Sequence, residues 1–259
     1  MSKLRITAVS YLNTLPFVYG IRNSGLLENY DLQLDIPSEC ARKFIKKETD
    51  IALVPVAALK KINLSAGGQD SYKLLNEYCI GSNGKVRSVL LLSQVPLNTI
   101  RNIHLDYHSL TSVNLAKVLS KHFWKINPGW INLNEHTEIN MTSMESVVAI
   151  GDKTFLLEKE FKYVYDLAAE WKKFSGLPFV FACWVADKNL PEERIKNFTD
   201  ALEWGVLNKK KAVENLFDAK KFPSVNIEEY LEKNIDFIFN TKKHQALKLF
   251  LEYIDFMEK

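Results

Sequence analysis

A chain of 259 residues, 47% of them apolar, is long enough for one large domain or for two smaller lobes with packed cores. Its 34 basic and 31 acidic residues are spread along the chain and leave a formal net charge of only +3, which argues against nucleic acid or an anionic membrane as a partner. No apolar run reaches the roughly 18 residues of a membrane span, and the first residues lack the apolar segment of a secretion signal. We therefore expect a cytoplasmic protein.

The first third of the chain alternates strand-like and helix-like segments. Apolar and β-branched runs predict strands at residues 4–9, 32–36 and 51–54. Helices are expected after Pro16, after Pro37 and over residues 56–62. This order of elements favours a parallel sheet covered by helices.

The pattern restarts in the middle of the chain. Strands are expected at residues 89–92, 103–106 and 147–150, with a helix over 113–122, which predicts a second sheet. Residues 178–185 again read as a strand, and the chain beyond Pro191 is helical in period almost to its end. We therefore predict an α/β protein of two lobes with a ligand cleft between them. One lobe would comprise residues 1–91 with 182–259, and the inserted lobe residues 92–181.

The turn between the first strand and the first helix is the first candidate site. It carries Ser10, Asn13 and Thr14, and Pro16 follows at a position where its missing N–H costs a helix nothing. A helix start presents unpaired N–H groups and the positive end of the dipole, so small polar side chains there suit a carboxylate or a phosphate. An ordinary capped helix is the alternative interpretation.

Three further polar turns fit a site of the same kind. Ser82 lies between two glycines, which permit close approach of a ligand, although a plain turn would look alike. Ser109, Thr111 and Ser112 place three hydroxyls at a helix start, where a simple cap needs one. Asp152 follows an apolar strand, the usual place for a working residue in an open α/β sheet or for a helix cap.

Neither a metal nor a cofactor is indicated. Cys40, Cys79 and Cys183 are far apart and show no paired-cysteine spacing, so we expect them to be reduced and buried. His104 and His108 would share one face of a helix, but the residues around them read as the end of a strand. The chain also lacks a glycine-rich phosphate loop and a nucleophile elbow.

Six segments stand in order along the chain: Ser10-Tyr11-Leu12-Asn13-Thr14 with Pro16, Pro37-Ser38-Glu39-Cys40-Ala41-Arg42, Asp50-Ile51-Ala52-Leu53-Val54-Pro55-Val56, Ile80-Gly81-Ser82, Val86-Arg87-Ser88-Val89 and Gly176-Leu177-Pro178-Phe179-Val180-Phe181-Ala182. Taken together, they resemble the chorismate dehydratase family, which serves the futalosine route to menaquinone. The resemblance runs in order from about residue 4 to about residue 186 and is weak in the helical tail. Thr154 departs from it, because alanine is expected there.

The resemblance implies the type II periplasmic-binding-protein fold and the loss of water from chorismate to give 3-[(1-carboxyvinyl)oxy]benzoate. This reaction needs hydrogen-bond donors at the carboxylate where charge grows more than it needs a metal. We expect Asn13 to orient the ring and to hydrogen-bond the leaving hydroxyl. Ser82, Ser109, Thr111 and Ser112 would hold carboxylates, and Ser10 and Thr14 belong to the same predicted binding set. The base is either Asp152 or the enolpyruvyl carboxylate of the substrate itself.

Two other functions stay open at this stage. A sister enzyme of the same route releases 1,4-dihydroxy-6-naphthoate and shares the fold. A non-catalytic binding protein for a small carboxylate is the second alternative, although the missing signal and the missing DNA-binding helices argue against a transport receptor and a regulator. The expected partner is a small molecule, and the chain is expected to be a monomer or a homodimer.

Overall fold

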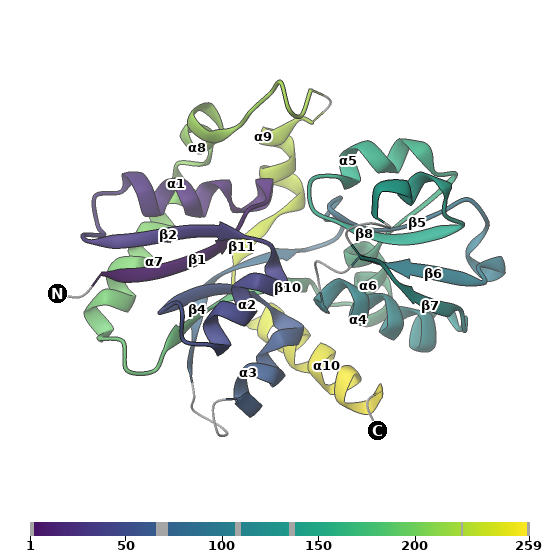
Figure 1. The fold of residues 1–259 in the computed structure, drawn as a ribbon, viewed down its shortest axis with the longest axis horizontal. Coiled ribbons are helices and arrows are strands. Elements are labelled where there is room, and N and C mark those ends of the chain that lie inside the picture. The colour runs from purple at the N-terminus through teal and green to yellow at the C-terminus, as the bar shows by residue number, and fades with distance from the viewer. Residues whose placement is uncertain (1–2, 66–71, 107–109, 135–137, 224, 258–259) are drawn as a thin grey trace. The chain divides into compact units, whose positions relative to one another are not determined.

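The computed structural model describes residues 3–65, 72–106, 110–134, 138–223 and 225–257 (Figure 1). The chain divides into two compact units, Met1–Gly81 with Val180–Asn240 and Ser82–Phe179 with Thr241–Lys259. It therefore changes unit three times, near residues 81, 179 and 240. The sequence pattern predicts the first two changes near residues 91 and 181 and places the final helix in the first unit, whereas the structure assigns that helix to the second unit.

The first unit is built on a six-stranded sheet in the order β11-β4-β10-β3-β1-β2. Parallel pairing joins β1 to β2 and to β3, as the alternating pattern predicted, but β10 runs antiparallel to β3 and β11 antiparallel to β4. The sheet is therefore mixed. Its strands are β1 (Leu4–Val9), β2 (Tyr30–Asp35), β3 (Ile51–Pro55), β4 (Tyr72–Ser82), β10 (Phe179–Asp187) and β11 (Asp236–Ile238).

Helices pack on this sheet and on one another: α2 contacts β1 and β3, and α1 contacts α7 and α8. The tail is less helical than its period indicated, because β11 lies inside it. The helices of the unit are α1 (Leu15–Asn23), α2 (Pro37–Ile45), α3 (Leu59–Ser65), α7 (Glu192–Leu207), α8 (Lys209–Leu216) and α9 (Ile227–Glu229), with the short turns η1 (Leu12–Thr14), η2 (Val56–Ala58) and η7 (Tyr230–Asn234).

Aromatic rings fill the core of the first unit. The ring of Phe17 on α1 lies 5.7 Å from that of Trp184 on β10, and Trp184 lies 4.9 Å from Phe198 on α7, both edge to face. All three side chains are fully buried, so the first helix is fixed to the sheet and to α7 by burial of large apolar area. The predicted burial of the three cysteines is confirmed.

The second unit contains the second sheet that the sequence predicted, in the order β7-β6-β8-β5-β9. β6 is parallel to β7 and β8, and β5 is antiparallel to β8 and β9. The carboxyl ends of β6 and β8 therefore share one edge with the start of β5. The strands are β5 (Val89–Ser93), β6 (Asn102–Leu105), β7 (Gly129–Asn132), β8 (Ser146–Ile150) and β9 (Tyr163–Asp166).

The final helix, α10, contributes to the aromatic core of this unit. The ring of Phe250 lies 4.9 Å from that of Phe179 and 5.9 Å from that of Trp171. These contacts fix α10 to the second unit. The helices are α4 (Leu110–Val118), α5 (Thr154–Leu157), α6 (Leu167–Ser175) and α10 (Thr241–Met257), with η3 (Leu97–Thr99), the π-helical turn η4 (Leu119–Trp124), η5 (Glu138–Ser143) and η6 (Glu158–Glu160). Among the described residues, no helix combines the length and the apolar content that a membrane crossing needs.

Candidate active-site residues in the two units

The predicted turn after β1 is closed by Thr14. The hydroxyl of Thr14 donates to the carbonyl oxygens of Val9 and Tyr11, at 2.5 and 2.6 Å, and its backbone N–H donates to Tyr11 at 3.0 Å. Its side chain is 1% exposed and makes no cap bond to the helix behind it. Thr14 therefore occupies the N-cap position of α1, but its side chain shapes the turn from inside and does not bond to the helix.

This closure leaves Asn13 at the surface of the turn. Asn13 is half-buried in η1, and Ser10 is exposed just after β1, where its backbone N–H donates to Asp35 at 2.9 Å. Within the part of the chain that the structure describes, neither the Asn13 amide nor the Ser10 hydroxyl has a hydrogen-bond partner. An amide offers two donors and an acceptor, so Asn13 can both donate to a ligand oxygen and accept from a hydroxyl.

Close helix packing fixes the position of this turn. A Cβ atom added at Gly20 of α1 would lie 2.0 Å from the carbonyl oxygen of Ala201, and one added at Gly205 of α7 would lie 2.0 Å from that of Pro16. Only glycine permits this approach of the two backbones. The turn that carries Asn13 is thus held against α7 from the first turn of α1 onward.

In the second unit, the polar segment that follows β4 is anchored at both ends. The Ser82 hydroxyl is 1% exposed and donates to the carbonyl of Gly84 at 2.8 Å. Further along, the backbone N–H groups of Val86 and Arg87 donate to the carboxylate of Asp166 at 2.9 and 2.7 Å. Arg87 has a φ of +63°, a conformation that costs a non-glycine residue energy and that these two bonds hold in place.

Asp166 anchors this segment, a role that no pattern in the sequence predicted. It also caps α6, because its carboxylate accepts from Ala168 and Ala169 at 3.1 Å. Burial raises the pKa of this carboxyl above its ordinary value, and the four backbone N–H groups that donate to it oppose the shift. An aspartate directly before a helical pattern is a standard cap signal, so the helix role was readable, but the partner 80 residues away was not.

The carboxyl edge of the second sheet gathers charged groups. Asp106 follows β6, and its carboxylate accepts from the backbone of Ile150 at 3.2 Å and forms an ion pair with Lys153 at 2.8 Å. Gly151 follows β8 and donates through its N–H to Ser88 at 2.9 Å. The structure therefore brings the start of β5 and the ends of β6 and β8 together, where ligands of open α/β sheets bind.

Asp152 lies in this edge, in the turn between β8 and α5. It is half-buried, and its carbonyl accepts from Phe155 at 3.3 Å. Gly151 before it has a φ of +73°, and the buried Thr154 hydroxyl donates back to the Gly151 carbonyl at 2.8 Å. Thr154, the departure from the family pattern, thus stabilises the turn on which Asp152 stands.

The predicted hydroxyl cluster is only partly described. Thr111 and Ser112 lie in the first turn of α4 and are each 1% exposed, so they are packed at the helix start. Ser109 lies outside the described residues, as does His108. His104 points Nδ1 at the carbonyl oxygen of Ser146, 2.9 Å away, and among the described residues no group of three or more potential metal ligands comes together.

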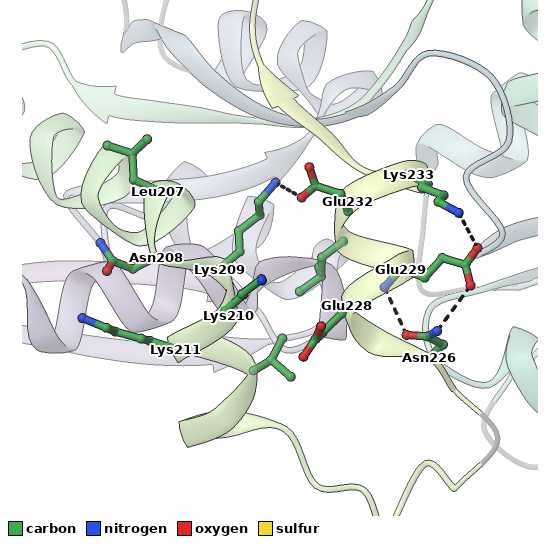
Figure 2. Close-up of a pocket in the computed structure, with 12 residues that line it drawn as sticks. Leu207, Asn208, Lys209, Lys210, Lys211, Asn226, Glu228, Glu229, Glu232 and Lys233 are labelled. Atoms are coloured by element: carbon green, nitrogen blue, oxygen red, sulfur yellow. Dashed lines mark hydrogen bonds and ion pairs between the residues drawn. The ribbon is translucent and has the colours of Figure 1, made fainter.

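A cavity in the first unit is lined by none of the candidate site residues named above. This cavity of about 730 Å³ lies between α8 and the α9–η7 segment. Figure 2 shows the residues that line it. Lysines and glutamates line it and pair with one another: Lys209 with Glu232 at 2.6 Å and Lys233 with Glu229 at 3.0 Å. Its charges are thus largely neutralised by ordinary surface ion pairs, and we assign it no part in the site.

Comparison with known proteins gives the family. The family model described as menaquinone biosynthesis matches residues 4–255. A chorismate dehydratase of Campylobacter jejuni is 26% identical over 255 residues, covering 94% of each chain. A chorismate dehydratase of Thermus thermophilus is 27% identical over 198 residues, 70% of this chain and 69% of the relative.

Solved structures agree on the fold. A protein of Archaeoglobus fulgidus has a TM-score of 0.76 at 13% identity, over 99% of this chain and 98% of its own. A Candida albicans protein described as having the generic periplasmic binding protein fold has a TM-score of 0.58 at 14% identity, over 98% and 95%. The predicted fold class is thereby confirmed. Because the family model spans nearly the whole chain, this protein belongs to the menaquinone biosynthesis family.

Proposed function

We propose that this protein is a chorismate dehydratase, which eliminates water from chorismate to give 3-[(1-carboxyvinyl)oxy]benzoate on the futalosine route to menaquinone. The observation that carries the proposal is the match of the menaquinone family over residues 4–255, together with two relatives named chorismate dehydratase. The neutral, hydrogen-bonding turn at Asn13 supports it independently, because the elimination needs an oriented donor near the departing hydroxyl.

The chemistry starts with loss of a proton from the ring carbon that bears the enolpyruvyl ether. The electron pair of that C–H bond is conjugated through a ring double bond to the ring carboxylate, so negative charge grows there in the transition state. The neighbouring hydroxyl then leaves, takes up a proton as water, and the ring becomes aromatic. Donors aimed at the ring carboxylate and at the leaving hydroxyl lower this barrier, each by about 3 kcal/mol.

Asn13 is the residue to which we assign the leaving hydroxyl. Its half-buried amide has no partner among the described residues, so binding a substrate breaks no internal hydrogen bond. We assign the carboxylates of chorismate to Ser82, Thr111 and Ser112, with Ser109 in the same set. Ser10 beside Asn13 supplies a further hydroxyl, and Thr14 acts through the shape of the turn.

The base is the enolpyruvyl carboxylate of chorismate in our preferred version. Asn13 is neutral and is a poor base, and the turn around it contains no carboxylate or histidine. A carboxylate is a weak base, but holding the substrate carboxylate near the C–H bond raises the rate of proton transfer by proximity. Asp152 is the alternative base, and it stands on the turn after β8.

The test is incubation of the purified protein with chorismate, beside a control without enzyme, followed by the ultraviolet spectrum and a chromatogram. Appearance of the benzoate and equal loss of chorismate are expected. Unchanged chorismate, with a folded protein by circular dichroism, would contradict the proposal. In that case turnover of the cyclic futalosine derivative would identify the sister enzyme, and binding without turnover would identify a carboxylate-binding protein.

A further inference from the structure

An ion pair with one buried and one accessible partner lies at the carboxyl edge of the second sheet. Lys153 Nζ is 2.8 Å from Asp106 Oδ2, the side chain of Asp106 is 0% exposed, and that of Lys153 is 25% exposed. The same carboxylate oxygen accepts the backbone N–H of Ile150 at 3.2 Å. The ammonium is therefore held in one place by a carboxylate that is itself fixed to β8.

Stability alone is a weak reason for such a pair. Removing two charges from water is costly, and apolar residues of similar volume often replace a buried pair without loss. A lysine that keeps part of its side chain in solvent can still present its ammonium to a ligand while the stem packs on the protein. Lys153, whose side chain is 25% exposed, is thus the member of the pair that a ligand can approach.

The pair also stands among residues of the candidate site. Lys153 directly follows Asp152, and Asp106 ends the β6 segment four residues before α4, whose first turn carries Thr111 and Ser112. The ends of parallel strands β6 and β8 are where an open α/β sheet binds its ligand. A cation fixed at that edge complements a carboxylate, and the neighbouring hydroxyls alone supply no charge.

We propose that Lys153 binds a carboxylate of the substrate, and that Asp106 is a positioning residue that holds the ammonium for it. The proposal rests on the proposed function, because it takes the ligand to be a dicarboxylate of the chorismate class. The Lys153 ammonium would then lie between two carboxylates, that of Asp106 on its buried side and that of the ligand on its solvent side.

The direct test measures affinity, not turnover, with the product 3-[(1-carboxyvinyl)oxy]benzoate as the probe in titration calorimetry. The variant is the double change Asp106→Asn with Lys153→Met, since Lys153→Met alone would remove a cation from beside a buried carboxylate. We expect its Kd for the dicarboxylate to rise at least about tenfold, and Lys153→Arg to recover part of the loss. Lys159→Met, an exposed lysine of η6, is the matched control and should bind as the wild type does.

Ester probes separate a ligand contact from a structural role. The two monomethyl esters of the product each lack one negative charge. The wild type should bind the dicarboxylate much more tightly than one of the two esters, and the double variant should bind these two ligands alike. A double variant that is folded and binds the dicarboxylate with wild-type affinity would overturn the proposal, as would equal affinities of the wild type for all three ligands.

The two proposals fail in different ways. Wild-type protein that leaves chorismate unchanged removes the dehydratase function, while the affinities of wild type and variant for the dicarboxylate still report on Lys153. Normal chorismate turnover by the wild type, together with unchanged dicarboxylate affinity in the folded double variant, removes the role of Lys153 alone. Wild-type protein that binds no dicarboxylate removes the role of Lys153, whether or not it converts chorismate.

Discussion

The turn after β1 and the carboxyl edge of the second sheet are constructed in opposite ways. In the turn, Thr14 bonds to carbonyls three and five residues before it, and the side chain presented is a neutral amide. At the edge, buried carboxylates reach across the chain: Asp166 holds residues about 80 positions away, and Asp106 holds Ile150, 44 positions away. One region is closed locally and is neutral, and the other is held by long-range contacts and is charged.

In the turn, the side chain presented to a ligand is therefore separate from the residue that stabilises the backbone. The local turn can lose its presented side chain without losing its shape, because the Asn13 amide has no hydrogen-bond partner among the described residues. The carboxylates of the edge are both anchors and sources of charge, so a change there affects stability and binding together. Variants in the two regions should therefore differ in which quantity they change.

The largest effect is expected from Asn13→Ala. Turnover of chorismate should fall by about 100-fold to 1,000-fold, since one donor at a developing charge is lost. The melting temperature should stay within a few degrees of the wild type. Steady-state kinetics and circular dichroism provide the measurements, and Asn215→Ala, an asparagine that bonds only within α8, is the control. Near-normal turnover would remove Asn13 from the mechanism.

Gly20→Ala tests the support of the turn rather than its chemistry. The new Cβ would lie 2.0 Å from the Ala201 carbonyl, so α1 and α7 must separate, and we expect a loss of about 3 kcal/mol in the free energy of unfolding. Urea titration measures it. At Gly25 a Cβ meets nothing within 4 Å although φ is +74°, so Gly25→Ala should cost only about 1 kcal/mol. Equal losses at both positions would argue against close packing as the cause.

Asp166→Ala breaks the long-range anchor of the second unit. Val86 and Arg87 lose their acceptor and α6 loses its cap, so we expect about 2 kcal/mol less stability and weaker turnover. Asp218→Ala is the matched control, because that aspartate accepts two backbone N–H groups in an exposed turn. A loss no greater than that of the control would show that the segment after β4 does not depend on Asp166.

Asp152→Asn should have the smallest effect if the substrate supplies the base. We expect turnover to fall by less than about tenfold, whereas loss of a general base costs about 100-fold to 10,000-fold. A pH profile of kcat/KM for both proteins adds a second measurement. A loss in the larger range would assign the base to Asp152.

The local region could be predicted from sequence, and the long-range region could not. Strand residues 4–9, the helix after Pro16 and the place of Asn13 in the turn between them follow from short-range patterns. The pairing of Asp106 with Lys153 and of Asp166 with Val86 depends on which strands become neighbours, which the local pattern does not specify. The same limit explains the missed strands β4, β7, β9 and β11, which are short, exposed or mixed in pattern.

The prediction that the last helix joins the first unit was wrong for a related reason. The helical period after Pro191 identified α7, but it gave no sign of which unit the last helix would join. Phe250 of α10 packs on Trp171 and Phe179 of the second unit. Such a choice is made by complementary packing of large rings, and a helical period does not report it.

The central claim is the identity of the substrate, and a competition experiment tests it most directly. The wild-type protein is given chorismate and the cyclic futalosine derivative together at equal concentration, and both are followed by chromatography. Our account predicts loss of chorismate, an equal amount of 3-[(1-carboxyvinyl)oxy]benzoate, and no loss of the futalosine derivative. Persistence of chorismate while 1,4-dihydroxy-6-naphthoate forms, or persistence of both compounds, would contradict it.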